Sequence, residues 1–125
     1  IGADVERMTR VIDLDRLASS VFAGSEAETF AKAELSDKRE VFFSFWTLKE
    51  AYIKARGMGL SLGLDGYAFD LAGPEPTISF NDRCPDDPAR WRFWRFRPTQ
   101  THALALAAPS HIKDVRIIWT DTVAA

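Results

Sequence analysis

The sequence of 125 residues contains very little cysteine and histidine. Its lone cysteine, Cys84, excludes an internal disulfide and fits a reducing compartment. Because Cys84 lies in a polar segment rich in turn-forming residues, we expect a thiol without a catalytic role. The two histidines, His102 and His111, are isolated in the sequence, so no cysteine–histidine metal cluster is present. We expect His102 to be structural and His111 to lie in a surface loop.

Long apolar runs and a strong charge of one sign are also lacking. No run approaches the roughly 20 apolar residues that a helix needs to cross a bilayer, and no basic-then-apolar leader opens the sequence. The formal net charge of −2 provides no global basic field for nucleic acid or an acidic membrane. We therefore expect a cytoplasmic protein that binds neither. The sequence begins at Ile1 without an initiator methionine, which favours a piece excised from a longer protein.

The composition favours one domain over residues 1–125. An apolar fraction of 46%, with four Trp, two Tyr and nine Phe, provides large side chains for a core. Predicted helices cover 13–22, about 25–33 and about 37–56, and predicted strands cover 1–6, 67–71, 77–80, 91–96, 103–107 and 115–120. The predicted helix caps are Ser25, Ser36 or Asp37, and Gly57. Helices followed by strands indicate an α+β fold with helices packed on a largely antiparallel sheet. The strand at 91–96 is apolar on both faces, so one face is expected to meet another domain or subunit.

Two carboxylates in the first strand are candidates for a metal site. Asp4 and Glu6 point to the same face of a strand, where they repel unless something positive lies between them. A hard divalent cation such as Mg²⁺ takes oxygen ligands and is often held by one or two carboxylates together with substrate phosphates. Taken alone, the pair is better explained as two solvated acids on an edge strand.

The long helix carries a second set of charged residues. Trp46, Glu50 and Lys54 recur every four residues and form one stripe, with Lys49 beside it. An ordinary surface Glu–Lys pair explains this stripe when the helix is considered by itself. A glycine-punctuated segment follows the helix, and glycine allows backbone to approach a ligand closely. Combined with Asp4 and Glu6, the stripe provides carboxylates for a metal, cations for phosphate charge and a base for a nucleophile's proton.

Both segments resemble the signatures of one family. The segment Gly2-x-Asp4-x-Glu6 resembles the first, and Trp46-x-x-Lys49-Glu50-Ala51-x-x-Lys54-x-x-Gly57-x-Gly59-Leu60-Ser61 resembles the second. The family is that of the 4′-phosphopantetheinyl transferases of the surfactin-synthetase-activating type. The resemblance continues through residues 62–71, is weaker at 101–109, and has no signature in 72–100. Either signature alone is weak, whereas the pair is specific.

The resemblance implies the fold of that family and a reaction. The phosphopantetheine arm of coenzyme A is moved onto a serine hydroxyl of an apo acyl or peptidyl carrier protein, releasing adenosine 3′,5′-bisphosphate. By position, Asp4, Glu6 and Glu50 would hold Mg²⁺, and Glu50 or a metal-bound water would accept the serine proton. Lys54 would contact the phosphate, and Lys49 would help to bind or orient the coenzyme.

The resemblance covers only the second of the two tandem copies that such transferases contain. Coenzyme A lies in the cleft between the copies, so the chain is expected to be the C-terminal, metal-binding half of a larger enzyme. The alternative is self-association, as in the short trimeric acyl-carrier-protein synthases. Two further hypotheses remain: a non-catalytic module that binds a carrier protein or coenzyme A, and an ordinary α+β domain with chance motifs.

Overall fold

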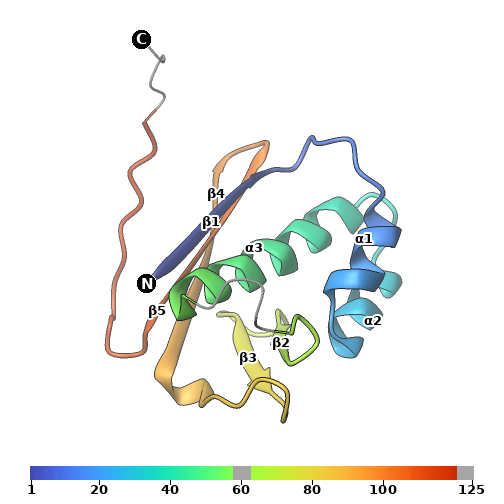
Figure 1. Cartoon of the computed structure of the whole chain (residues 1–125). Helices are drawn as coiled ribbons and strands as arrows, with labels where there is room; N and C mark the ends of the chain where they lie inside the picture. The colour runs from blue at the N-terminus through green and yellow to red at the C-terminus, as the bar shows by residue number, and fades with distance from the viewer. Residues whose placement is uncertain (58–62, 121–125) are drawn as a thin grey trace.

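The computed structural model describes residues 1–57 and 63–120, and within these ranges it contains three α-helices and five strands (Figure 1). In chain order they are β1 (Gly2–Arg7), α1 (Leu14–Val21), α2 (Gly24–Lys32), α3 (Lys38–Arg56), β2 (Tyr67–Asp70), β3 (Thr77–Phe80), β4 (Trp91–Thr99) and β5 (His102–Pro109), with a short 3₁₀ helix at Pro88–Arg90 before β4. No helix in the described ranges is long and apolar enough to cross a membrane.

The strands form two antiparallel sheets. One has the order β1-β5-β4, and the other is the β2–β3 hairpin. In the larger sheet Asp4 pairs with Ala105 and Glu6 with Ala103, which places both acids on one face of an edge strand. The α+β class and the antiparallel pairing predicted from the sequence are confirmed, although the strands divide between two sheets.

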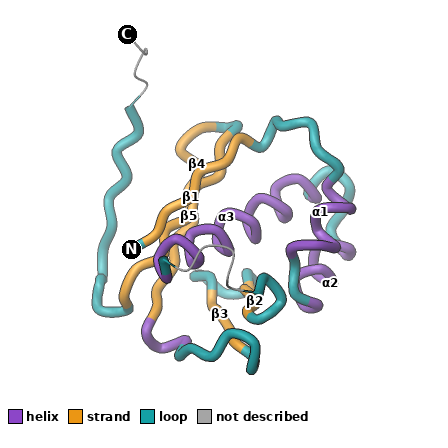
Figure 2. The backbone as a smooth tube through the Cα atoms, viewed as in Figure 1, coloured by secondary structure: helices purple, strands orange, loops and turns teal. Residues whose placement is uncertain are grey.

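The core lies between α3 and the larger sheet, because α3 crosses one face of that sheet (Figure 1). The β5 residues in this core are alanines without exposed surface: Ala103, Ala105 and Ala107. Their small side chains allow helix and sheet to approach closely. The core continues as an aromatic cluster where α1 and α2 pack beside α3 (Figure 2), made of Phe22, Phe30, Phe42 and Phe45.

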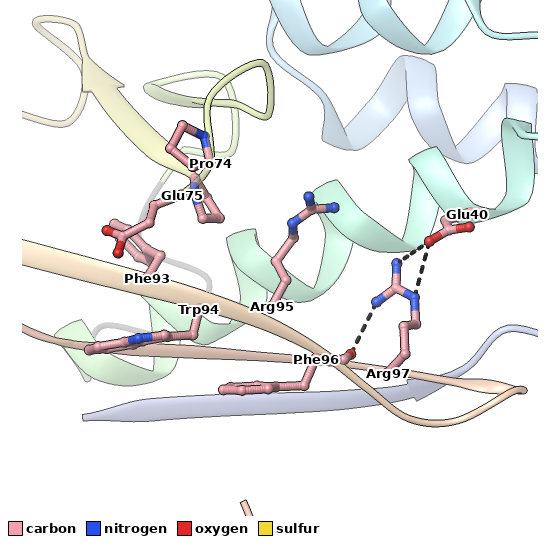
Figure 3. Close-up of a pocket in the computed structure, with 9 residues that line it drawn as sticks. Glu40, Pro74, Glu75, Phe93, Trp94, Arg95, Phe96 and Arg97 are labelled. Atoms are coloured by element: carbon pink, nitrogen blue, oxygen red, sulfur yellow. Dashed lines mark hydrogen bonds and ion pairs between the residues drawn. The ribbon is translucent and has the colours of Figure 1, made fainter. Parts of the chain in front are cut away.

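Two arginines connect β4, at the edge of the sheet opposite β1, to the first half of α3 (Figure 3). Arg95 and Arg97 are two residues apart on the strand and share one face. Arg95 donates to Ser44 Oγ at 3.1 Å, and Arg97 donates to the same oxygen at 2.9 Å. Arg97 also forms an ion pair with Glu40 at 3.1 Å. These contacts attach the edge strand to the helix.

The helix ends follow the prediction in part. Gly57 ends α3 with a φ of 68°, the left-handed conformation that favours glycine, as predicted. Asp37 precedes α3, but its side chain makes no capping hydrogen bond. The predicted Ser25 cap is wrong, because α2 already begins at Gly24. The Glu26 carboxylate accepts the Ala23 N–H at 2.9 Å and caps that helix instead.

The predicted strand at 115–120 is also wrong, since no strand is assigned there. Its apolar alternation is typical of a strand, but β5, the strand before it in the chain, is already paired with β1 and β4. The segment therefore cannot form a hairpin with β5, and Ile118 remains 73% exposed. Trp119 packs against the His102 ring, with centroids 5.4 Å apart.

Candidate active site

The candidate site forms where β1 lies against the middle of α3. A Cβ atom placed on Gly2 would lie 2.1 Å from the Ala51 carbonyl oxygen and 2.4 Å from the Ala55 nitrogen. Any side chain at this position would collide with the helix backbone, so glycine is required for the contact. Because alternate strand residues share a face, Asp4 and Glu6 follow Gly2 along the side that meets α3.

Asp4 is a buried carboxylate with one unsatisfied oxygen. Its side chain is 6% exposed, and Oδ1 accepts a 2.8 Å hydrogen bond from Lys54 Nζ. Within the described part of the chain, the buried Oδ2 has no hydrogen-bond partner. The pKa of Asp4 is raised to about 6, because burial together with the Glu6 and Glu50 charges outweighs the hydrogen bond and charge of Lys54. The site therefore concentrates more negative charge than its own lysine neutralises.

Glu6 extends the same row of acids toward solvent. Its Oε2 accepts from the Arg10 guanidinium at 3.0 Å, and its Oε1 accepts from the Trp46 indole N–H at 3.4 Å. The Trp46 indole therefore orients the Glu6 carboxylate, a role that the sequence pattern does not indicate. Arg10, four residues after Glu6, also lies outside the motifs.

Glu50 comes from α3 and lines a groove of about 610 Å³ between α1, α3 and residues 63–65. Among residues 1–57 and 63–120, its carboxylate has no hydrogen-bond or ion-pair partner. Burial raises the pKa of Glu50, with the Lys54 charge lowering it and the Glu6 charge raising it. A half-buried carboxylate with a raised pKa beside a groove is well suited to accept a proton.

Lys54 is the cation nearest these acids. Its side chain is 50% exposed, and the hydrogen bond to Asp4 raises its pKa. The amine therefore stays charged and remains accessible to an anionic ligand.

The carboxylate oxygens of Asp4, Glu6 and Glu50 are suitable ligands for a magnesium ion, but they are not arranged around a preformed metal site. Among the residues that the structure describes, no three Asp, Glu, His or Cys side chains converge as metal ligands. Asp4 and Glu6 instead bond to Lys54 and Arg10. The donor set consists of carboxylate oxygens, which Mg²⁺ prefers, and the orphaned Asp4 Oδ2 is an available ligand atom.

Lys49 lies apart from this group and points into the core, and its predicted role in binding or orienting the coenzyme stays a prediction. The side chain has no exposed surface, and Nζ donates to Glu26 at 2.6 Å and to the Tyr67 carbonyl oxygen at 2.8 Å. The second Glu26 oxygen accepts the Phe69 N–H at 2.9 Å. Burial lowers the pKa of Lys49, and the Glu26 charge opposes that shift. This buried ion pair joins α2, α3 and β2; the role of Glu26 was not predicted from the sequence.

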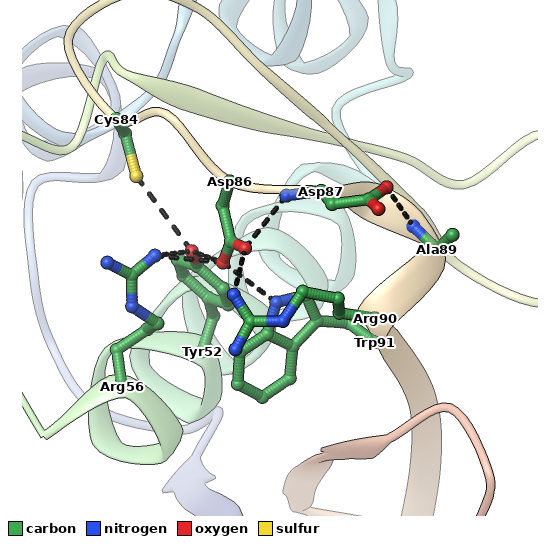
Figure 4. A network of polar contacts seen from close by, with 8 residues as sticks. All are labelled: Tyr52, Arg56, Cys84, Asp86, Asp87, Ala89, Arg90 and Trp91. Atoms are coloured by element: carbon green, nitrogen blue, oxygen red, sulfur yellow. Dashed lines mark hydrogen bonds and ion pairs between the residues drawn. The ribbon is translucent and has the colours of Figure 1, made fainter.

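A polar network anchors the loop before β4 to the last turns of α3 (Figure 4). The Asp86 carboxylate accepts from Tyr52 at 2.6 Å, Arg56 at 2.8 Å, Trp91 at 2.8 Å and Arg90 at 2.9 Å. Burial opposes ionisation of Asp86, but these hydrogen bonds and the Arg56 charge lower its pKa to about 2. Cys84 is buried here too, with its sulfur 3.9 Å from the Tyr52 hydroxyl. The glycine-rich segment after α3, including Gly59, lies mostly outside the described residues.

The chain is similar to known proteins of one family. A family model described as the 4′-phosphopantetheinyl transferase superfamily matches residues 1–107. The chain is 39% identical over 77 residues to the 4′-phosphopantetheinyl transferase HetI from Nostoc, which covers 62% of the chain and 32% of HetI. It is 26% identical over 118 residues to the 4′-phosphopantetheinyl transferase Sfp from Bacillus subtilis, covering 94% of the chain and 51% of Sfp.

A solved structure has the same fold. The holo-(acyl-carrier-protein) synthase from Bacillus anthracis, determined in complex with CoA (3′,5′-ADP), superimposes with a TM-score of 0.64 at 19% identity. The match covers 85% of this chain and 90% of that chain. It confirms the fold that the sequence resemblance implies.

The family match includes both sets of residues that meet at the β1–α3 contact. The chain spans about half the length of Sfp and a third of HetI, so it matches only part of each relative. Because the family model covers most of the chain and the fold agrees, the chain belongs to the 4′-phosphopantetheinyl transferase superfamily.

Proposed function

We propose that the protein containing this chain transfers the phosphopantetheine arm of coenzyme A to a serine hydroxyl of an apo acyl or peptidyl carrier protein. The observation that carries the proposal is the meeting of Asp4 and Glu6 with Glu50 and Lys54 across the β1–α3 contact. Three carboxylates this close repel one another, and Lys54 and Arg10 offset only part of that repulsion, so a further cation would stabilise the site. Phosphoryl transfer from a pyrophosphate requires such a combination of acids and cation.

Asp4, Glu6 and Glu50 are the residues that would hold Mg²⁺. When bound, the ion would neutralise the charge that develops on the pyrophosphate oxygens. Asp4 contributes its unsatisfied Oδ2, and Glu6 contributes a carboxylate already oriented by Trp46. Lys54 is bonded to the other Asp4 oxygen, Oδ1, so it would remain beside the site.

Glu50 would act as the general base. Its raised pKa makes the carboxylate a stronger proton acceptor, and its position beside the groove leaves it open to a serine hydroxyl. The serine oxygen forms a bond to the phosphorus that carries the pantetheine arm. The bond from that phosphorus to the bridging oxygen breaks, and adenosine 3′,5′-bisphosphate leaves. Lys54 would stabilise negative charge on the transferred phosphate.

We further propose that the chain is the metal-holding half of a two-copy enzyme. Its extent relative to Sfp supports this proposal. The outer face of the larger sheet also supports it, because Trp94 and Phe96 remain only partly buried there. The alternative is association of identical chains, which is supported by the match to most of the short Bacillus anthracis synthase. Light scattering of the purified chain, alone and coexpressed with an N-terminal half, would distinguish the two arrangements.

The test of function is a transfer assay. Full-length protein, apo carrier protein, coenzyme A and Mg²⁺ are combined, and the carrier is examined by intact-mass spectrometry. We expect one added phosphopantetheine per carrier and no addition when the metal is chelated. Calorimetric binding of coenzyme A without any transfer would instead indicate a binding module, and transfer that persists in chelator would contradict the metal assignment.

A further inference from the structure

A second concentration of charge lies at the β4 edge of the larger sheet, where Arg95 and Arg97 face α3 (Figure 3). Two guanidinium groups share one hydroxyl oxygen, Ser44 Oγ, at 3.1 and 2.9 Å. Ser44 itself is 1% exposed, so this oxygen is a fixed point within the fold. Like charges this close are unfavourable unless negative charge lies nearby.

The two nearby carboxylates, Glu40 and Glu75, are each paired with an arginine other than Arg95. Arg97 is paired with Glu40 at 3.1 Å, and the neighbouring Glu75 is paired with Arg92 at 2.7 Å. Among the residues that the structure describes, Arg95 has no carboxylate partner. Burial lowers the pKa of Arg95, the Arg97 charge lowers it further, and the Glu40 charge opposes both. Arg95 is exposed and has a side-chain hydrogen bond to Ser44, so its guanidinium is open to an added anion.

A cavity of about 290 Å³ opens beside this guanidinium. It lies between β4, the first half of α3 and the loop that joins β2 to β3, as Figure 3 shows. Pro74, Pro76 and Phe93 provide apolar walls, and Glu40 and Glu75, which are paired with Arg97 and Arg92, also line the cavity. This volume is at the lower end of the range for ligand pockets, which favours a small ligand over a whole nucleotide.

We propose that this cavity binds a phosphate-sized oxyanion through Arg95, either inorganic phosphate or the phosphate group of a small monoester. A guanidinium presents a planar fork of donors that matches two phosphate oxygens. Ser44 and Glu50 are separated by about 9 Å along the helix axis and about 120° around it. The site is therefore distinct from the proposed catalytic carboxylates and does not depend on the proposed function.

The direct test uses the arginine Nε–H resonances of the full-length protein in magnesium-free buffer. The Arg95 resonance is assigned by its loss in Arg95→Lys, which keeps a positive charge at this position. Titration with inorganic phosphate should shift this resonance in a saturable way, and glycerol phosphate in a second titration reports whether a monoester is accepted. Saturation by either compound supports the site. If neither compound shifts the Arg95 resonance in a saturable way, the proposal is overturned, even if other arginines respond.

Calorimetry provides a matched comparison of variants. Arg95→Gln should weaken phosphate binding by about tenfold or more, because charge-assisted hydrogen bonds are lost. Arg16→Gln is the control, since Arg16 is an exposed arginine on α1 away from the cavity. Equal phosphate affinity in wild type and a folded Arg95→Gln variant would overturn the proposal. The resonance titration decides the question in wild type if the variant does not fold.

Discussion

The Nζ atom of Lys54 donates a 2.8 Å hydrogen bond to Oδ1 of Asp4, across 50 positions of sequence. The bond connects the long helix to the first strand and leaves Asp4 Oδ2 buried without a partner in the described part of the chain. The two signatures that the sequence shows separately therefore form one site. In this state the protein's own cations partly neutralise the acids that a metal would bind.

Replacing Glu50 tests the proposed base. Glu50→Gln removes a carboxylate without hydrogen-bond partners among the described residues, so the fold should be unchanged. Transfer to the carrier should fall by about 10²–10⁴-fold, the usual contribution of a general base. The measurement is the initial rate by intact mass, with circular dichroism to check folding. The control is Glu34→Gln at an exposed position before α3; an unchanged rate in Glu50→Gln would remove Glu50 from the mechanism.

Adding one methyl group at Gly2 should separate β1 from α3. The new Cβ in Gly2→Ala would meet the Ala51 carbonyl oxygen at 2.1 Å, so strand or helix must move. Overpacking of this kind costs typically 1–3 kcal/mol in the free energy of unfolding. Gly24→Ala is the matched control, because nothing lies within 4 Å of a Cβ there. Urea unfolding of the two variants checks this prediction, and equal stability of both would contradict the close contact.

Lys49→Met should destabilise the fold without changing coenzyme affinity. The substitution leaves Glu26 buried without its cation, and breaking a buried pair costs about 3–5 kcal/mol. Glu26→Gln combined with Lys49→Met should recover part of this loss. The control is Lys32→Met, which removes a largely exposed pair with Glu28 at 2.9 Å and should cost little.

The same variant separates the two possible roles of Lys49. Steady-state transfer is measured at a temperature where Lys49→Met remains folded. The KM for coenzyme A should match that of wild type, because the Lys49 amine has no exposed surface. A large rise in KM together with unchanged stability would restore Lys49 as a ligand for the coenzyme.

Asp86 should make stability sensitive to acid. Its pKa of about 2 in the folded chain is below its ordinary value of 3.8, so ionised Asp86 stabilises the fold above pH 3.8. This contribution, about 2 kcal/mol from the size of the shift, is lost as the pH falls from about 4 to 2. Asp86→Asn should be less stable near neutral pH and should lose less stability on acidification. Unfolding free energies from pH 6 to pH 2 check the difference, and parallel profiles would contradict it.

Much of the candidate site can be predicted from sequence, because strand and helix periodicity place side chains on faces. Alternation along β1 places Asp4 and Glu6 together, and a spacing of four residues in α3 aligns Glu50 with Lys54. The helix stop at Gly57 also follows from local chemistry, since left-handed backbone favours glycine. These features depend on residues within a few positions of one another.

The partners of buried charges were decided by tertiary structure. Lys49 is adjacent to Glu50 in sequence, yet a rotation of about 100° around the helix turns it into the core. There its partner is Glu26, 23 positions away, and no local pattern identifies that carboxylate. The same holds for Asp86, which meets Tyr52 across 34 positions. The segment 115–120 has a strand-like pattern, but a strand also requires pairing with a neighbouring strand, and none is formed there.

The sequence by itself therefore determined most of the elements, the faces of β1 and α3, and the identity of the chemical groups. Only the tertiary structure decided which groups meet, since that depends on the close β1–α3 contact that Gly2 permits and on the burial that removes Lys49 from solvent. The physical reason is that periodicity is a local property of the chain. Burial and ion pairing instead depend on segments that come together only when the chain has folded.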